Sequence, residues 1–422
     1  MKKTVLNLTL ILVSLILLQS CSKDSNPVTP VTPPANDSTF ASITWTQGTV
    51  AFGENELGAI GSNNEDYTNI TFNKSNTKVS GLDVDDIIFI YGKVIRKITS
   101  VTDLGNTVEV EAEAVNMNEA IDDATIYWDK EVRFTSDMKK DISIVSGYPT
   151  IRKEGAEDVT FEVKFSEDLK GTITLKLNDA KLDATCEVIK KKGASQSKYA
   201  FEGYLQKFKN QGKIVYENSS LKNYDHTMSG LQGEITLSLT ATSQLSELFG
   251  AIELPFVLLQ IPTVVGGVPV VLKLKMLFVV NTTFGTIDAS AYIKTKFSYN
   301  SDVGLKYAGS TVGVTANAGP IQFESNSDSI HVATSAAAGA NFGLTFPRFE
   351  VSILGGLVVP YIHTAFLIGG SFVTGLHPCM KIDASFIGAV GYDFDFFGLI
   401  GFGGSKTLWQ IDKNLKKAGD CP

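Results

Sequence analysis

The sequence predicts an all-β protein, in which a small N-terminal β module precedes a larger β-sandwich-like region of antiparallel strands. From residue 40 onward, short runs rich in Val, Ile, Thr and aromatic residues alternate with polar residues between Gly and Asn turns, which is the strand pattern. Helical periodicity is nearly absent, with short helical segments expected only at residues 116–121 and 243–249. The 37 glycines suit bends and bulges in large curved sheets.

The chain opens with a secretory signal, expected over residues 1–20. Lys2 and Lys3 precede an apolar run at residues 4–17. That run is too short to span a bilayer as a helix, and no stop-transfer pattern follows it.

The end of this signal, Leu18-Gln19-Ser20-Cys21, resembles the bacterial lipobox. In that family the cysteine is lipidated and becomes the first residue of the mature protein. The resemblance implies that Cys21 carries acyl chains such as palmitate. Several chains would anchor the protein firmly, since each buried methylene adds roughly 0.8 kcal/mol. An ordinary signal peptide with a chance cysteine is the alternative.

The residues after Cys21 bear on the location of the protein. Ser22 is not Asp, and by resemblance to lipoproteins of diderm bacteria this favours the outer membrane. Lys23-Asp24 partly resembles the short signal that sends Bacteroidota lipoproteins to the cell surface, although Ser25 replaces a second acid. We therefore expect an outer-membrane lipoprotein at the cell surface, with the periplasmic face as the alternative.

Size and charge restrict the class of protein further. The 422 residues suffice for two or three domains with real cores. Removal of residues 1–20 leaves 35 basic and 45 acidic residues, a net charge of −10. Nucleic acid and anionic bilayers both attract positive surfaces, so neither is expected as the main partner.

Four cysteines are present, and export would place them in an oxidising compartment. Cys379 and Cys421 are the expected disulfide pair, because that link would fasten the C-terminal tail to the body. Cys186 would then be left over, and three free thiols beside Cys21 are the alternative. No pair of cysteines has the spacing of a zinc site.

A proline-rich stretch at residues 21–39 is expected to form a stiff tether after the lipidated cysteine. A small β domain at 40–135 should follow. Within it, residues 75–125 resemble a recurrent module of large exported bacterial proteins with no settled function, through the Asp-Asp-Ile-Ile and Lys-Val-Ile-Arg-Lys-Ile text at 85–98. The resemblance implies a β module and export, and no chemistry.

The remainder, residues 136–422, is expected to be one large β-rich domain, with two sub-domains as an option. Hairpin turns are expected at Lys170-Gly171, Gly266-Gly267 and Gly369-Gly370. Two long uncharged tracts, at 254–272 and 351–380, have the hydropathy of membrane helices. Proline and glycine interrupt both, at a cost of about 1 to 3 kcal/mol each inside a helix. Buried sandwich strands are therefore expected, with membrane-inserting β strands as the alternative.

No group of residues forms a recognisable catalytic site, so no catalytic residue, metal or cofactor is expected. His377-Pro378-Cys379 is the nearest approach to a nucleophile and base, but the proline between them prevents pairing. Gly401–Thr407 lacks the order of a phosphate-binding loop. Several groups of acidic residues are expected to lie on one face of a strand or turn. The simpler interpretation is that these faces are exposed to solvent, and the alternative is that they bind calcium. These acidic residues are Asp83, Asp85, Asp86, Glu109, Glu111, Glu113, Asp393 and Asp395.

These observations favour a lipid-anchored envelope protein that binds or adheres and catalyses no reaction. An unknown protein or glycan is the expected ligand. The alternatives are a polysaccharide-acting enzyme on a β scaffold and a membrane-inserting β protein. The tryptophans Trp45, Trp128 and Trp409 could stack on sugars, but core packing is their commoner role.

Overall fold

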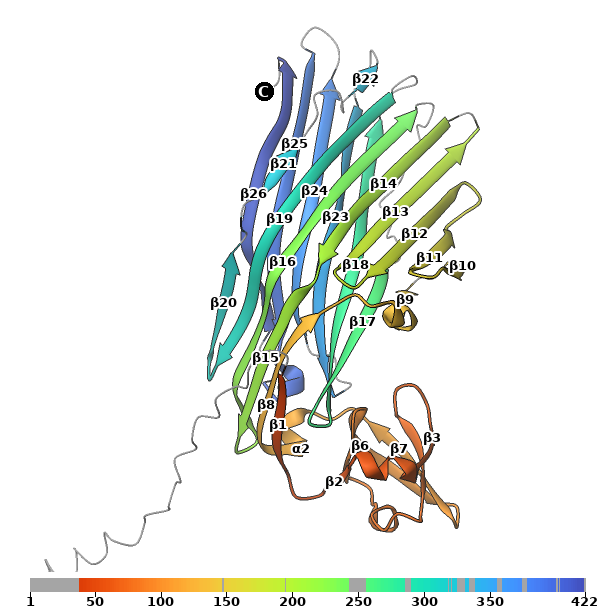
Figure 1. Cartoon of the computed structure of the whole chain (residues 1–422), viewed down its shortest axis with the longest axis vertical. Coiled ribbons are helices and arrows are strands. Elements are labelled where there is room, and N and C mark those ends of the chain that lie inside the picture. Colours follow the sequence, from red (N-terminus) through yellow and green to blue (C-terminus); the bar gives the residue numbers. More distant parts are fainter. Residues whose placement is uncertain are drawn as a thin grey trace, which may run out of the picture. The chain divides into compact units, whose positions relative to one another are not determined.

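A computed structural model shows an all-β fold, as the sequence predicts (Figure 1). The structure describes residues 38–420 except 146–147, 194, 243–255, 285–289, 318, 320, 325–330, 334–337, 355–358, 374–377, 400 and 402. The signal segment, Cys21, Cys421 and the helical segment expected at 243–249 lie outside these residues. The strands of the described part form three sheets, with 13, seven and six strands.

The six-stranded sheet has the order β2-β5-β6-β7-β4-β3. Its strands are β2 (Thr49–Phe52), β3 (Ile60–Asn63), β4 (Asn69–Asn73), β5 (Ile87–Ile90), β6 (Val94–Asp103) and β7 (Thr107–Glu113). The sheet encloses its own core, in which the rings of Phe52 and Phe72 stack at 5.0 Å beside buried Ile and Val side chains. The alternation of β7 places Val108 and Val110 in this core.

The 13-stranded sheet contains the first strand of the described chain and most of the central sequence. Its strands are β1 (Ser38–Trp45), β8 (Ile121–Val132), β10 (Thr150–Glu154), β11 (Asp158–Lys164), β12 (Leu169–Asn178), β13 (Lys181–Lys192), β14 (Ser195–Gln206), β15 (Phe208–Glu217), β16 (Ser220–Thr242), β19 (Ser290–Ala308), β20 (Thr311–Asn317), β21 (Gln322–Glu324) and β22 (His331–Ala333). The order runs β1-β8-β15-β16-β14-β13-β12-β11-β10, and β19 joins the other edge of β16. Both β1 and β8 therefore belong to this sheet, although they lie within the expected 40–135 segment or at its start.

The seven-stranded sheet has the order β26-β25-β24-β23-β18-β17-β9. Its strands are β9 (Ile142–Val145), β17 (Phe256–Val265), β18 (Val268–Phe284), β23 (Ala338–Ile353), β24 (Val359–Val373), β25 (Cys379–Asp393) and β26 (Gly403–Gly419). All neighbours in it are antiparallel. Short helices link strands in the described chain: η1 (Glu54–Ala59), η2 (Val79–Gly81), α2 (Met117–Ala120), η3 (Ser136–Asp141) and η5 (Asp395–Phe397). The helical segment expected at 116–121 thus corresponds to α2.

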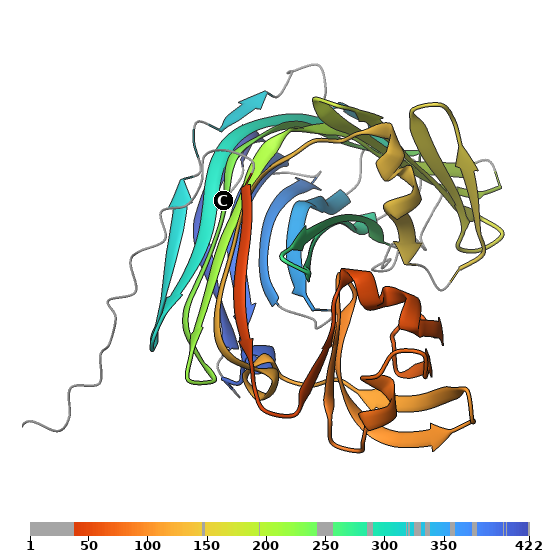
Figure 2. The ribbon, with the colours of Figure 1, turned by 60° about the horizontal axis from the view of Figure 1, so that its bottom comes forward.

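The two larger sheets pack face to face and curve together (Figure 2). Aromatic pairs join them: Phe201 meets Phe346 at 5.9 Å between ring centroids, and Phe208 meets Phe349 at 5.0 Å. The Tyr199 hydroxyl also donates a hydrogen bond to the Gly343 carbonyl at 3.1 Å. The predicted sandwich therefore exists, and its core lies between these two sheets.

Side-chain alternation decides which residues enter this core. Strand β12 buries every second position, including Ile173, Leu175 and Leu177, and exposes or half-exposes the residues between them. In antiparallel ladders, directly paired residues point to the same side. One alternation therefore carries across the sheet and separates a buried face from an outer face, which is directed away from the seven-stranded sheet.

A buried polar group interrupts the apolar core between the sheets. Asn210 Oδ1 lies 2.8 Å from His226 Nε2 and 3.4 Å from the indole nitrogen of Trp128. An amide oxygen only accepts hydrogen bonds, so Nε2 of His226 carries the proton. Its Nδ1 is buried with no hydrogen-bond partner in the described chain. Burial lowers the pKa of His226 to about 4, and the ring is therefore neutral.

The predicted turns have mixed outcomes. Gly266-Gly267 does form the turn between β17 and β18, with φ values of 55° and 93°. The turn predicted at Lys170-Gly171 is wrong, because both residues lie inside β12. A Cβ on Gly171 would lie 2.9 Å from the Phe165 ring, so glycine is needed there for packing. The turn predicted at Gly369-Gly370 is also wrong: both residues pair within β24 to strands on either side.

The described residues of the two uncharged tracts lie mostly in strands of the seven-stranded sheet. In β18, Leu272 and Leu274 are buried against the sandwich core, while Lys273 and Lys275 occupy the opposite face. Lys275 pairs at 2.6 Å with Glu350 of β23. None of the helices in the described part of the chain has both the length and the apolar character needed to cross a membrane.

Candidate functional site

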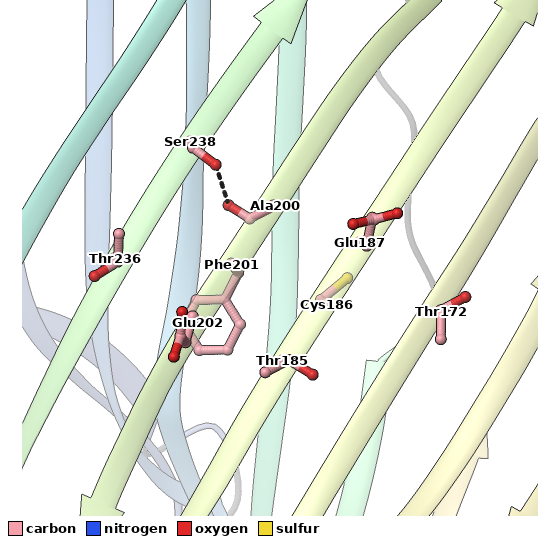
Figure 3. Close-up of a pocket in the computed structure, with 9 residues that line it drawn as sticks. All are labelled: Thr172, Thr185, Cys186, Glu187, Ala200, Phe201, Glu202, Thr236 and Ser238. Atoms are coloured by element: carbon pink, nitrogen blue, oxygen red, sulfur yellow. Dashed lines mark hydrogen bonds between the residues drawn. The ribbon is translucent and has the colours of Figure 1, made fainter. Parts of the chain in front are cut away.

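The outer face of the 13-stranded sheet contains a hollow of about 470 Å³ (Figure 3). It lies over the middle of four adjacent strands, β12, β13, β14 and β16. Its floor includes Cys186 and Phe201. The side chains around it are Thr172, Thr185, Glu187, Ala200, Glu202, Thr236 and Ser238.

Strand register brings these residues together. Thr172 pairs with Glu187, Glu187 with Ala200, and Ala200 with Ser238, which makes one row across the four strands. Thr185, Glu202 and Thr236 make the next row. Each of these positions is two residues from its neighbour along the strand, so all of them point outward.

The hollow exists because short side chains occupy its middle. Ala200 and Ser238 stand side by side, and the Ser238 hydroxyl donates a 3.5 Å hydrogen bond to the Ala200 carbonyl (Figure 3). Lys198 and Glu187 stand beside them as long side chains and form an ion pair. The depression is therefore set by side-chain length on an otherwise regular sheet.

The two carboxylates of the hollow differ in their electrostatic surroundings. Glu187 is half-buried and paired with Lys198. Glu202 is exposed and has no ion-pair or hydrogen-bond partner among the residues that the structure describes. Other carboxylates on this face are paired with lysines, as in Glu234–Lys296 at 2.8 Å. The hollow therefore holds one carboxylate that no described residue of the chain compensates.

This lining suits reversible binding of a polar molecule. Hydroxyls can both donate and accept hydrogen bonds, and carboxylates accept them. Glu187 and Glu202 project from the same sheet face, on the neighbouring strands β13 and β14. Cys186 offers no nucleophile, since its side chain is buried, and burial raises the pKa of its thiol.

The acidic residues singled out in the sequence have local structural roles. Asp86 accepts a hydrogen bond from the backbone NH of Asp83 at 2.8 Å, and Asp85 pairs with Lys97 at 2.9 Å. Asp393 Oδ1 accepts from the backbone NH of Asp395 at 2.9 Å, which fixes the start of η5. In the described chain, no group of three or more His, Cys, Asp or Glu side chains is arranged to hold a metal ion.

The row Glu109, Glu111 and Glu113 faces away from the core of the six-stranded sheet, opposite Val108 and Val110. Lys97 lies directly across from Glu113 in the β6–β7 ladder. This row is therefore the solvated face of a half-buried strand.

The predicted cysteine and aromatic sites have separate outcomes. Cys379 is disulfide-bonded and Cys186 is free. The expected partner, Cys421, lies outside the described residues, so the pairing stays a prediction. Gly419 pairs with Cys379 in the β25–β26 ladder, which brings the tail alongside. The tryptophans pack against the core, with Trp128 fully buried. The glycine-rich segment that ends at Thr407 leads into strand β26.

Comparison with protein-family models, with curated proteins and with solved structures finds no match. The fold and the hollow together define a β-sandwich with a polar hollow on the outer face of one sheet. The residues of the hollow give little signal in the sequence, because each strand contributes only one to three of them.

Proposed function

We propose that this chain is a lipid-anchored cell-envelope protein that binds a polyhydroxylated ligand, such as a glycan, in the hollow on the 13-stranded sheet. Cys21 would hold it to the outer membrane through its acyl chains, and residues 22–37 would space the folded part from the lipid. The ligand would be held and released without bond-making.

The observation that carries this proposal is the lining of the hollow. Threonine and serine hydroxyls and two carboxylates converge on a space of about 470 Å³, within the size range of ligand pockets. Such groups match the alternating donors and acceptors of a sugar, whereas an apolar ligand would find few partners. The open position on a sheet face leaves room for a ligand attached to a larger surface.

Binding can be tested with the full-length lipidated protein in detergent micelles on a glycan array. The variant Ala200→Gln would fill the hollow from an outward-facing position without entering the core. Thr125→Gln, at a half-exposed position of β8 in the same sheet, is the matched control. We expect Ala200→Gln to abolish the glycan signal and Thr125→Gln to preserve it. Equal binding by both variants would place the ligand elsewhere.

The anchor is tested separately by fractionation and protease treatment of intact cells. Cys21→Ser should move the protein from the membrane to the soluble fraction. Cleavage of the wild-type protein on whole cells would support the surface location, and protection until the outer membrane is opened would support the periplasmic face. Membrane retention of Cys21→Ser would refute the lipid anchor.

A further inference from the structure

A second hollow, of about 290 Å³, adjoins the first on the same sheet face. The two share Thr172 and Glu187. The second extends along β12 and β13 to Glu167, Asp168, Lys170 and Lys191. Its end is fixed by the turn before β12, where the Lys191 NH donates to the Asp168 carbonyl at 2.8 Å.

Together the two hollows form a groove that is longer than one sugar. The first crosses four strands, which spans about 14 Å at about 4.8 Å per strand spacing. The second continues for four residues along the strands, about 13 Å at about 3.3 Å per residue. A short oligosaccharide would fit this path, with its units over successive pairs of side chains.

The charges along the groove are uneven. In the second hollow, Lys170 and Lys191 stand among Glu167 and Asp168, so both signs are present there. In the first, Lys198 compensates Glu187, while Glu202 remains without a partner in the described chain. An uncompensated carboxylate in a hydroxyl-lined hollow favours a ligand that brings its own positive charge and hydroxyls.

We propose that the groove selects an oligosaccharide with free amino groups, and that Glu202 recognises one ammonium group. This inference rests on the proposed glycan-binding function and names its substrate class. The hydroxyl lining from Thr185, Thr236 and Ser238 favours an amino sugar over a lysine-rich peptide, whose stem would leave these hydroxyls unpaired.

The test uses the full-length protein in detergent and calorimetric titration with glucosamine oligomers and their N-acetylated counterparts. We expect the free amine form to bind about tenfold more tightly, since hydrogen bonds to charged groups are the stronger ones. Glu202→Gln preserves size and hydrogen bonding but removes the charge, so it should erase this preference. Glu111→Gln, at an exposed position of β7, is the matched control.

The outcomes separate the two proposals. One outcome is that neutral oligomers bind, that Ala200→Gln abolishes this binding and that Glu202→Gln changes nothing. In that case the groove binds glycans, but the amino-sugar inference is wrong. If no oligomer binds the wild-type protein, the proposed function itself fails. Equal competition by a lysine-rich peptide, or an equal effect of Glu111→Gln, would also overturn the role assigned to Glu202.

Discussion

Acidification should destabilise the sandwich through His226. The unfolded histidine has a pKa near 6.5, whereas burial lowers the folded pKa to about 4. The unfolded chain therefore binds more protons between these values. The stability that depends on the neutral ring is present above pH 6.5 and is lost as pH falls through this window.

The size of the effect follows from the two pKa values. One pKa unit corresponds to about 1.36 kcal/mol, so moving from about pH 7 to about pH 5 should lower the free energy of unfolding by roughly 2 kcal/mol. Exposed carboxylates with lowered pKa values, such as Asp103 and Glu131, titrate mainly below this window and contribute little to the change.

Urea unfolding at about pH 7, 6 and 5 measures this change as a fall in the midpoint at constant slope. His226→Gln is the matched variant, because its amide can still donate to Asn210 but does not titrate. Between about pH 7 and about pH 5, the free energy of unfolding of this variant should fall by roughly 2 kcal/mol less than that of the wild-type protein. The same pH dependence in both proteins, or an NMR titration of His226 with a pKa near 6.5, would refute the reasoning.

Three other changes test the packing, charge and covalent features. Gly212→Ala should lower the free energy of unfolding by about 1–3 kcal/mol in chemical denaturation, because its Cβ would lie 1.9 Å from the buried Trp128 ring. Gly58→Ala is the control and should not destabilise the protein, because a Cβ there would meet open space. Equal losses of stability in the two variants would contradict this reasoning. Glu350→Gln should lower the free energy of unfolding by about 3 kcal/mol, because Lys275 and Arg348 would lose the buried carboxylate between them. An unchanged unfolding midpoint would show that solvent already screens the charges of these two side chains. Reduction of the disulfide at Cys379 should lower stability by about 2–4 kcal/mol, and peptide mapping without reduction should find Cys379 linked to Cys421; a link to Cys186 would contradict the predicted pairing.

The strands could be predicted from the sequence more readily than their turns. Alternation over Phe161–Leu182 indicates strands directly, because period two is a local property. The structural role of a glycine is ambiguous in the sequence. Gly267 supplies a left-handed turn conformation, whereas Gly171 makes room for the Phe165 ring. Only the fold distinguishes these two roles, since Phe165 must first be placed over its neighbour strand.

The hollow could not be predicted, because it is a property of register. Thr172, Glu187, Ala200 and Ser238 come from four strands and acquire meaning only when the ladders align them. Ala200 is an unremarkable residue in the sequence, and its small size matters only beside Glu187 and Ser238. The uncompensated charge of Glu202 likewise depends on which lysines lie across from it.

The position of β1 determines how a pulling force would travel through the protein. β1 lies at an end of the 13-stranded sheet and directly follows the segment proposed as the tether, while the hollow lies on β12, β13, β14 and β16 of that sheet. With the anchor and the ligand site as proposed, a load between ligand and membrane would cross the backbone hydrogen bonds of β14, β16, β15, β8 and β1 in turn. The six-stranded sheet, inserted between β1 and β8 in sequence, would bear none of this tension until the β1–β8 ladder opened. Mechanical failure would then begin at β1, and the extra length released would be the chain between β1 and β8.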